Sequence, residues 1–327
     1  MSASRGLSGF AKFAWLALAY NIVVILWGVF LRASKSGDGC GQHWLTCRGE
    51  VIPSAPELKT IIEFSHRLTS GLAFVVVLVL LVWAFRRFGK GSTVRKTALV
   101  SFIFIITEAL VGAGLVLTGN TAENLTAARP FWAVGHLINT FILLAFLSLT
   151  AWLADREREA NRHIEPKYLA FLGVGVVGIL LVGSSGSVAA LSTMLFPSAS
   201  ISEGIAKDFS EASNILLRLR VSHPILSILT SVYLVFLSGW LKARFEDEAG
   251  VARWSKTLSL LVLGQVAFGA ATLLTLAPIV MQIGHLLLAD LVWIAFILLS
   301  GCVLTRERTD SDAESPRVSK GQTASYT

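Results

Sequence analysis

The chain has 327 residues, of which 54% are hydrophobic and only 15% are charged, and its formal net charge is +7. Soluble domains average about 25% charged residues, so this composition excludes an ordinary soluble domain and favours a protein surrounded by lipid. The positive charge does not indicate nucleic-acid binding, because the basic residues stand in short clusters between apolar runs and no nucleic-acid-binding motif accompanies them. Three cysteines exclude a scaffold of several disulfides but permit one bridge.

Apolar runs of spanning length predict the secondary structure. A membrane-spanning helix needs about 20 mostly apolar residues, and a backbone in lipid must satisfy its own hydrogen bonds, which favours helices. The first run is too long for a signal peptide and no cleavage pattern follows it, so we expect it to be retained. The sixth is the least regular, because Arg218 and Arg220 fall in its first turns. The predicted spans are residues 13–33, 64–85, 98–118, 131–154, 168–190, 215–241, 257–276 and 281–304.

Lysine and arginine predict the orientation of these spans. The loops and ends on one side of the predicted membrane hold 19 of the 28 basic residues, and those on the other side hold 9. Because the richer side is cytoplasmic, we expect both termini inside the cell, in its inner (plasma) membrane. Residues 306–327 are predicted to form a disordered cytoplasmic tail. Residues 34–62, 119–130 and 191–214 are expected to lie outside.

An internal repeat divides the apolar part of the chain. The second and sixth spans carry His66 and His223, which are 157 residues apart. Matching segments of the third and seventh spans carry Glu108 and Gln265 with the same offset. We therefore predict an all-α integral membrane protein of eight helices, arranged as two pseudo-symmetric four-helix bundles. The predicted halves are residues 1–160 and 161–305.

Four of the six histidines fall inside predicted spans, each near the outer end. An ionisable residue inside a span is a functional hypothesis by default, although a single one can also hydrogen-bond a neighbouring helix. Zinc usually takes three or four ligands, often with cysteine or carboxylate, whereas heme iron takes one or two axial ligands, often histidine. Two histidines in each half therefore predict two heme sites. The predicted ligand pairs are His66 with His136 and His223 with His285.

Charged residues near these histidines suggest further roles. Glu63 precedes His66 by three residues, so a helix places both on one face. We predict that Glu63 carries protons or orients the imidazole, and the alternative is a carboxylate that caps the helix. The second half has arginine at the matching position, which predicts one catalytic heme site and one electron-transfer site. The candidate contacts for heme propionates, which could alternatively be interfacial anchors, are Arg67, Arg129, Arg218 and Arg220.

Two of the three cysteines lie close together in the first outer loop, in the segment GCGQHWLTCRG. Because the outer compartment is oxidising, we favour a structural disulfide between Cys40 and Cys47. A redox-active pair that passes electrons remains the alternative. Cys302, at the inner end of the eighth span, is expected to be a packed small apolar residue.

These segments resemble the heme A synthase family, called CtaA in bacteria and Cox15 in mitochondria. The resemblance covers roughly residues 13–304 and rests on the paired cysteines and on the segments IIEFSHRLTSGL, GHLINT, VSHP and IGHLLLADL. It implies a heme b cofactor between the C-terminal pair of histidines and the substrate heme O near the N-terminal pair. It also implies oxidation of the C8 methyl of heme O to a formyl group by successive hydroxylations, with Glu63 as the essential carboxylate.

The resemblance also bears on the surroundings of the protein. It implies a heme O synthase and an electron donor as partners, besides the lipid bilayer, and no nucleic acid. The segments SKSGDG and GQHWLT, before and after Cys40, depart from the family pattern, so His43 is expected to be a surface residue. The sequence leaves the oligomeric state open, including a homo-oligomer. It also leaves open how the methyl is oxidised when two histidines occupy the iron.

Two other functions are compatible with these residues. A di-heme b-type electron-transfer protein, such as a quinol-linked cytochrome, would also use four histidines, but that class often places its hemes near opposite membrane faces. Here all four predicted ligands lie on one side. A transporter would carry broken helices or polar groups at the membrane midplane, for which the hints are Glu108 and Asp290.

Overall fold

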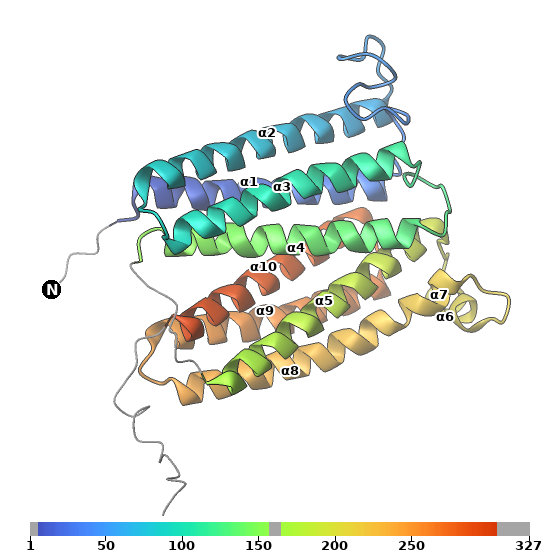
Figure 1. The fold of residues 1–327 in the computed structure, drawn as a ribbon. Coiled ribbons are helices and arrows are strands. Elements are labelled where there is room, and N and C mark those ends of the chain that lie inside the picture. The colour runs from blue at the N-terminus through green and yellow to red at the C-terminus, as the bar shows by residue number, and fades with distance from the viewer. Residues whose placement is uncertain (1–5, 157–164, 306–327) are drawn as a thin grey trace, which may run out of the picture.

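The computed structural model describes residues 6–156 and 165–305, and these fold into helices and loops without a β-strand (Figure 1). The predicted tail 306–327 lies outside the described residues, as does His163. The helices in chain order are α1 (Gly9–Ala33), α2 (Leu58–Arg87), α3 (Thr93–Leu117), α4 (Arg129–Leu153), α5 (Pro166–Leu195), α6 (Ile201–Phe209), α7 (Ile215–Arg220), α8 (Ser222–Arg244), α9 (Ala249–Leu274) and α10 (Ile279–Leu304).

Eight helical segments are long and apolar enough to cross a membrane, with α7 and α8 together forming one of them. The predicted class, an all-helical multi-pass membrane protein, is therefore confirmed. The helices are mostly longer than the predicted spans. α9 begins at Ala249 instead of 257 and includes Arg253 and Lys256. Long basic side chains can pack their stems on apolar surface while the charged ends stay in water, so a helix continues past its apolar stretch.

The second half contains two features that were not predicted. α6 is a short amphipathic helix whose exposed Ile201, Ile205 and Phe209 recur every four residues on one face. The sixth span is interrupted at Val221, so that α8 begins anew at Ser222. Pro224 lies in the first turn of α8, where its missing N–H removes no helical hydrogen bond.

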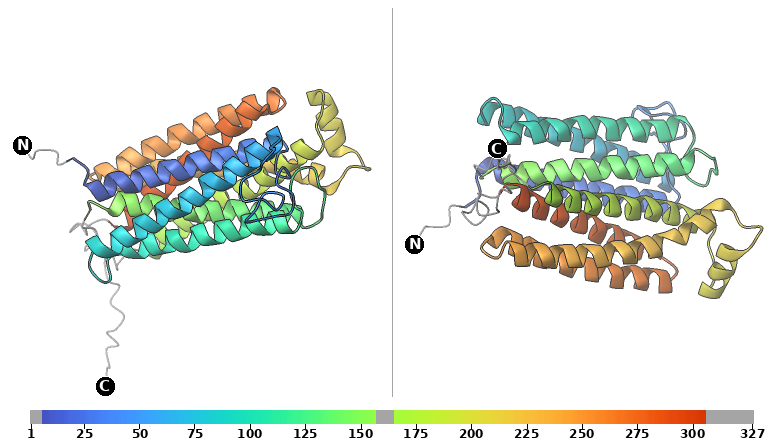
Figure 2. Two further views of the ribbon diagram at one scale, coloured as in Figure 1. Left: turned by 90° about the horizontal axis from the view of Figure 1, so that it is seen from above. Right: turned by 60° about the horizontal axis from the view of Figure 1, so that its bottom comes forward.

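The spanning helices lie side by side in two groups (Figures 1 and 2). In the first, α2 and α4 both pack on α1 and α3, so α2 and α4 stand at opposite corners. In the second, α8 and α10 both pack on α5 and α9 and stand at opposite corners. Contacts of α10 with α1 and α4, and of α4 with α5, join the groups. The pseudo-symmetry and the boundaries at 160 and 305 stay predictions.

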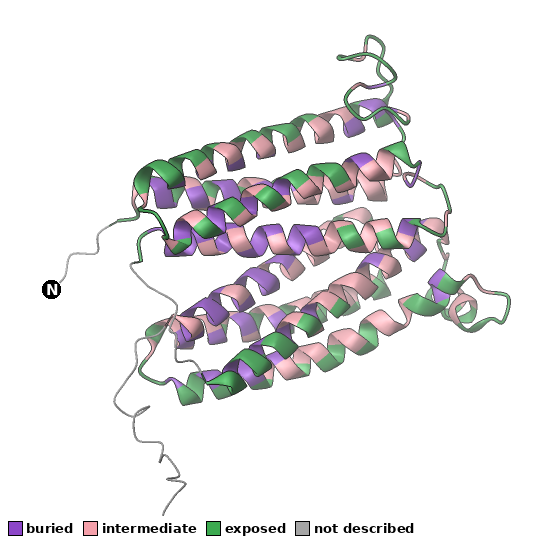
Figure 3. Ribbon diagram, viewed as in Figure 1, coloured by how far each residue is buried: buried purple, intermediate pink, exposed green. Residues whose placement is uncertain are grey.

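The buried core is concentrated at one end of the bundle (Figure 3). In α4 the buried residues lie from Asn139 onward, apart from Arg129 at the start of the helix. In α10 they lie from Asp290 onward. Trp293 on α10 donates a buried hydrogen bond of 2.6 Å to the carbonyl oxygen of Phe141 on α4, and the two rings stack. At the opposite end, where α4 and α10 begin, most residues are partly exposed, which leaves that end less tightly filled by side chains.

Asp290 is fully buried on α10, and neither carboxyl oxygen has a hydrogen-bond partner among the described residues. A buried polar group without a partner costs about 1–3 kcal/mol, so Asp290→Leu is expected to raise the midpoint temperature of unfolding in detergent. The exposed Asp247 provides the control, because Asp247→Leu relieves no burial. A lower midpoint for Asp290→Leu than for the parent chain would show that the carboxyl has a stabilising partner.

Candidate functional site

The four predicted ligands lie on α2, α4, α8 and α10, each within the first turns of its span. These four helices all begin at the same end of the bundle, on the right in Figure 1. The structure therefore brings the four histidines to one end of the molecule, opposite the tightly packed core. Within each group they come from helices at opposite corners, so the space between each pair is the interior of a bundle.

The imidazoles of His223 and His285 face each other across the second group. Their ring centroids are 6.3 Å apart and their planes are nearly perpendicular, at 86°. A metal bound to two imidazoles through bonds of about 2.0–2.1 Å holds the two nitrogens about 4 Å apart. The remainder of the observed separation matches the distance from each nitrogen to the centre of its ring. The centroid separation thus has the size expected for two imidazoles that share one metal atom, as in heme with two histidine ligands, and the ligand pair stays a prediction.

One ring nitrogen of His223 contacts α5. Its Nδ1 lies 3.2 Å from the carbonyl oxygen of Val182 and 3.2 Å from Oγ of Ser185, both on α5. A metal-binding histidine usually donates its other ring N–H to such an acceptor, which fixes the tautomer and the ring orientation. With Nδ1–H directed at α5, Nε2 of His223 is the nitrogen available to a metal.

Glycines allow three of the imidazoles to lie close to a neighbouring helix. A Cβ placed on Gly186 would stand 2.9 Å from Cε1 of His223, and one placed on Gly269 would stand 2.9 Å from Cε1 of His285. A Cβ placed on Gly28 would stand 3.1 Å from Cε1 of His66. These glycines were missed by the sequence analysis as site residues. A signal was present, because Gly28 and Gly186 are 158 residues apart, close to the repeat offset.

The close approach at Gly269 makes a testable prediction. Gly269→Ala is expected to displace His285 and to weaken heme binding in the second half about tenfold. Loss of a residue that orients a metal-binding side chain has an effect of this size. Gly112 is its counterpart in the first half, and a Cβ there would meet nothing within 4 Å. Gly112→Ala should therefore leave the heme of the second half unchanged. Heme titration followed by absorption measures both, and equal affinities for the two variants would contradict the prediction.

In the first half, His66 and His136 lie close enough to interact electrostatically. The Nδ1 atom of each is buried and has no hydrogen-bond partner among the described residues. Nδ1 of His136 lies 3.5 Å from Oε1 of Glu108 on α3, too far for a formed hydrogen bond. The hydrogen-bonding capacity of these two buried nitrogens is thus not used within the described residues.

Glu63 lies beneath the loop between α1 and α2. It is only 3% exposed, its Oε2 accepts a hydrogen bond of 2.8 Å from the backbone N–H of Cys40, and its other oxygen pairs with Arg67 one turn along α2. The hydroxyl of Thr60 donates to the carbonyl oxygen of Gly39 at 2.8 Å, which binds the loop to the start of α2. The carboxylate is thus held in one position by a partner four residues away on its own helix and by a backbone group 23 residues away in the loop.

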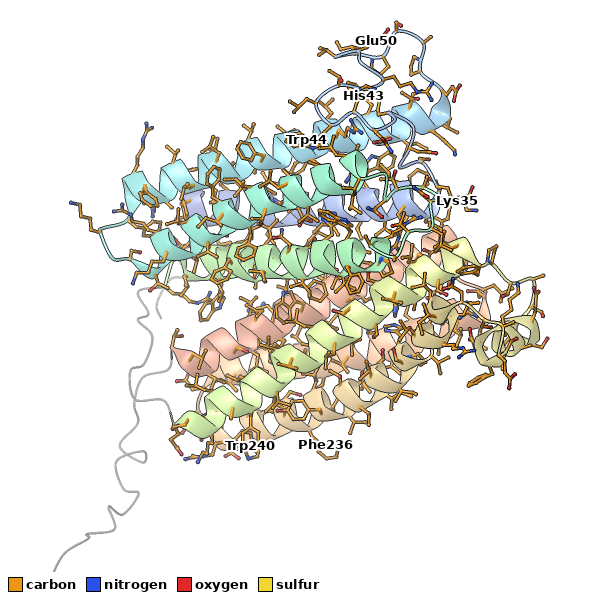
Figure 4. All side chains as sticks on the ribbon, turned by 45° about the vertical axis from the view of Figure 1, so that its right-hand side comes forward. Lys35, His43, Trp44, Glu50, Phe236 and Trp240 are labelled. Atoms are coloured by element: carbon orange, nitrogen blue, oxygen red, sulfur yellow. A yellow bond between two sulfur atoms is a disulfide. The ribbon has the colours of Figure 1, made fainter. Side chains whose placement is uncertain are left out.

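Cys40 and Cys47 form a disulfide, and both are buried, whereas His43 and Trp44 between them are exposed (Figure 4). The predicted bridge and the predicted surface position of His43 are confirmed; whether the bridge also has a redox role stays a prediction. Cys302 is buried, as expected for a packed small side chain.

Removal of this bridge is expected to destabilise the loop above Glu63. Closing a short loop by a disulfide stabilises a fold by about 2–3 kcal/mol in the chain-entropy model, so the double variant Cys40→Ser, Cys47→Ser should unfold at a lower temperature. Cys302→Ala leaves the bridge intact and serves as the control. A double variant as stable as this control would show that packing alone holds the loop.

The four arginines predicted to contact heme propionates all hydrogen-bond to backbone carbonyl oxygens at the histidine end, in loops for three of them and in α6 for Arg220. Arg220 also pairs with Asp208 at 2.5 Å. These contacts bind the arginines to the connecting segments, and contact with a ligand stays a prediction. The carbonyl acceptors belong to His43, Trp44 and Thr46 for Arg67, to Ala122 and Asn124 for Arg129, to Ser210 and Glu211 for Arg218, and to Gly204 for Arg220.

Arg32 was not predicted as a site residue. It lies in the last turn of α1, and its buried Nε has no hydrogen-bond partner among the described residues. It is near enough to Arg129 to be repelled by it. Two guanidinium groups that repel each other, one with an unsatisfied buried donor, suit an anionic partner. The sequence analysis missed Arg32 because an arginine at the end of a span is ordinarily an interfacial anchor.

Comparison with known proteins places these residues in a wider context. The family model COX15-CtaA, described as cytochrome oxidase assembly protein, matches residues 11–297. The chain is 30% identical over 279 residues to a heme A synthase of Shouchella clausii, which covers 83% of this chain and 89% of that protein. It is 27% identical over 319 residues to a heme A synthase of Bacillus cereus, covering 94% and 98% of the two chains.

A second kind of relative carries a different name. The chain is 42% identical over 299 residues to a protein of Thermus thermophilus named protoheme IX farnesyltransferase. The match covers 91% of this chain and 49% of that protein, so this chain spans about half the length of that relative.

Proposed function

Because the chain belongs to the COX15-CtaA family of cytochrome oxidase assembly proteins, we propose that it is a heme A synthase. It would oxidise the C8 methyl of heme O to a formyl group by successive hydroxylations and loss of water. Relatives named heme A synthase match along 89% and 98% of their length. The relative named farnesyltransferase matches along only 49% of its length. The transferase name can therefore refer to the part of that protein outside the match.

The observation that carries the proposal is the pairing of histidines at one end of two helix groups. His223 and His285, with ring centroids 6.3 Å apart, would hold a heme b cofactor. When bound, such a heme accepts and passes single electrons. His66 and His136 would bind the substrate heme O in the first group, where Glu63 lies one turn from His66. The propionates of the substrate would lie near Arg32 and Arg129 at the end of that group.

The role of Glu63 in this reaction is to hold or move a proton beside the substrate methyl. A carboxylate suits this task when it is fixed and close to the reacting group. The N–H of Cys40 and the guanidinium of Arg67 fix both oxygens of Glu63, and the disulfide loop above them shields the carboxylate from water. Arg220 occupies the matching position in the second half, which supports catalysis in the first half alone.

The proposed surroundings follow from charge and from the relatives. Both termini would lie in the cytoplasm, since the loops on their side carry most of the basic residues. A heme O synthase is the proposed partner that supplies the substrate. The Thermus relative supports it, because that polypeptide bears a heme farnesyltransferase name and contains a segment similar to this chain. An electron donor is also required.

Co-expression with a heme O synthase tests the proposal. Extracted hemes from cells with both proteins should contain heme A, identified by chromatography, and cells with the heme O synthase alone should contain heme O. Heme B as the sole pigment of the purified chain, with no heme A formed, would instead support a di-heme electron-transfer protein. A purified chain without bound heme would contradict both functions.

A further inference from the structure

Glu108 on α3 is held rigidly against α4. Its Oε1 accepts a hydrogen bond of 2.5 Å from the hydroxyl of Thr140, and its Oε2 accepts one of 2.6 Å from the side-chain amide of Asn139. The hydroxyl of Thr107 donates to the amide oxygen of Asn139 at 2.5 Å, which fixes the direction of that amide. Both oxygens of Glu108 therefore act as acceptors, in a position that the two helices define.

The same carboxylate faces a predicted iron ligand. Oε1 of Glu108 lies 3.5 Å from Nδ1 of His136, and this nitrogen has no other partner among the described residues. Thr140 links the two groups, since its hydroxyl also contacts the carbonyl oxygen of His136 at 2.9 Å. A small rotation of the ring would let Nδ1–H donate to Glu108 and would leave Nε2 of His136 for a metal. This is the carboxylate–histidine–metal arrangement found at many metal sites.

The second half has no equivalent charge. Gln265 occupies the position that matches Glu108, and its Nε2 lies 3.5 Å from Nε2 of His285. The other ligand of that half, His223, is oriented by the neutral carbonyl oxygen of Val182. Both side chains lie next to the histidine of the following helix, but Glu108 faces Nδ1 of His136 whereas Gln265 faces Nε2 of His285.

We infer that Glu108 is a positioning residue, which orients His136 and makes it a more strongly electron-donating ligand than any histidine of the second half. A carboxylate hydrogen-bonded to the far side of an imidazole raises its basicity, and hydrogen bonds to the axial ligand are one means by which a protein adjusts heme iron. Glu108 thereby distinguishes the substrate site from the cofactor site. The inference rests on the proposed function only in that a heme binds between His66 and His136.

The test compares full-length variants loaded with hemin. Hemin is titrated into the purified chain and followed by its main absorption band, and the ferric low-spin signals are recorded by electron paramagnetic resonance. Glu108→Gln is expected to lower the hemin affinity of one of the two sites 10- to 100-fold, the usual effect of removing such a partner. It is also expected to move the paramagnetic resonance signal of that site toward the signal of the other site. The reciprocal variant Gln265→Glu should move the signal of the second site in the opposite direction.

Controls separate this inference from the proposed function. Thr140→Val removes one hydrogen bond to Glu108 and should change the hemin affinity and the signal in the same direction as Glu108→Gln, but by less. If Glu108→Gln does not fold, Thr140→Val alone tests the role of Glu108. Parental affinity and signal in both Glu108→Gln and Thr140→Val would overturn the role of Glu108 while leaving two heme sites intact. A parental chain that binds no hemin in the first half would instead contradict the proposed function itself.

Discussion

Glu63→Gln is expected to lower the conversion of heme O to heme A roughly 10²–10⁴-fold, the usual contribution of a positioned acid–base group. The amide has nearly the shape of the carboxylate, and its one oxygen can still accept a hydrogen bond from Cys40 or from Arg67, although not from both. It cannot take up and return a proton. Heme binding by the four histidines should persist. The measurement is the ratio of heme A to heme O in extracts of cells that also make heme O.

Glu57→Gln provides the matched control. Glu57 stands immediately before α2, is mostly exposed, and has its Oε2 3.8 Å from a guanidinium nitrogen of Arg48. Loss of its charge should therefore leave the ratio of heme A to heme O unchanged. If Glu63→Gln forms heme A at the parental rate, Glu63 is a loop-holding residue and not a catalytic one. If it loses heme binding as well as activity, its main role is structural.

The second large effect is expected for the second pair of histidines. His285→Ala should remove one ligand of the site whose rings are 6.3 Å apart, and the purified chain should hold about one heme where the parent holds about two. His136→Ala should remove the other heme. Replacement of one ligand leaves the facing imidazole in place, so any residual heme should show the spectrum of iron with a single histidine.

His43→Ala controls for this series, because His43 is exposed in the disulfide loop and is expected to bind no heme (Figure 4). Two hemes with unchanged spectra in His285→Ala would rule out the proposed ligand pair. Loss of both hemes in His285→Ala would show that the two halves do not bind independently.

The pattern of apolar residues was sufficient to predict eight spans and the helical class, because hydropathy and hydrogen bonding in lipid act on each segment separately. It failed at helix ends, as at Ala249, where basic side chains extend a helix beyond its apolar stretch. It also missed α6, since nine residues are too few for a span and their apolar face becomes evident only from its exposure.

The sequence by itself determined which residue types stand at the histidine end: His66 and His223 at the repeat offset, Glu63 one turn before a histidine, and a pair of cysteines in one loop. Only the tertiary structure decided their partners. The carbonyl of Val182 at His223 and the N–H of Cys40 at Glu63 come from other elements, 41 and 23 residues away. Such contacts depend on how helices pack against one another, and backbone groups, being common to all residues, leave no mark in a sequence.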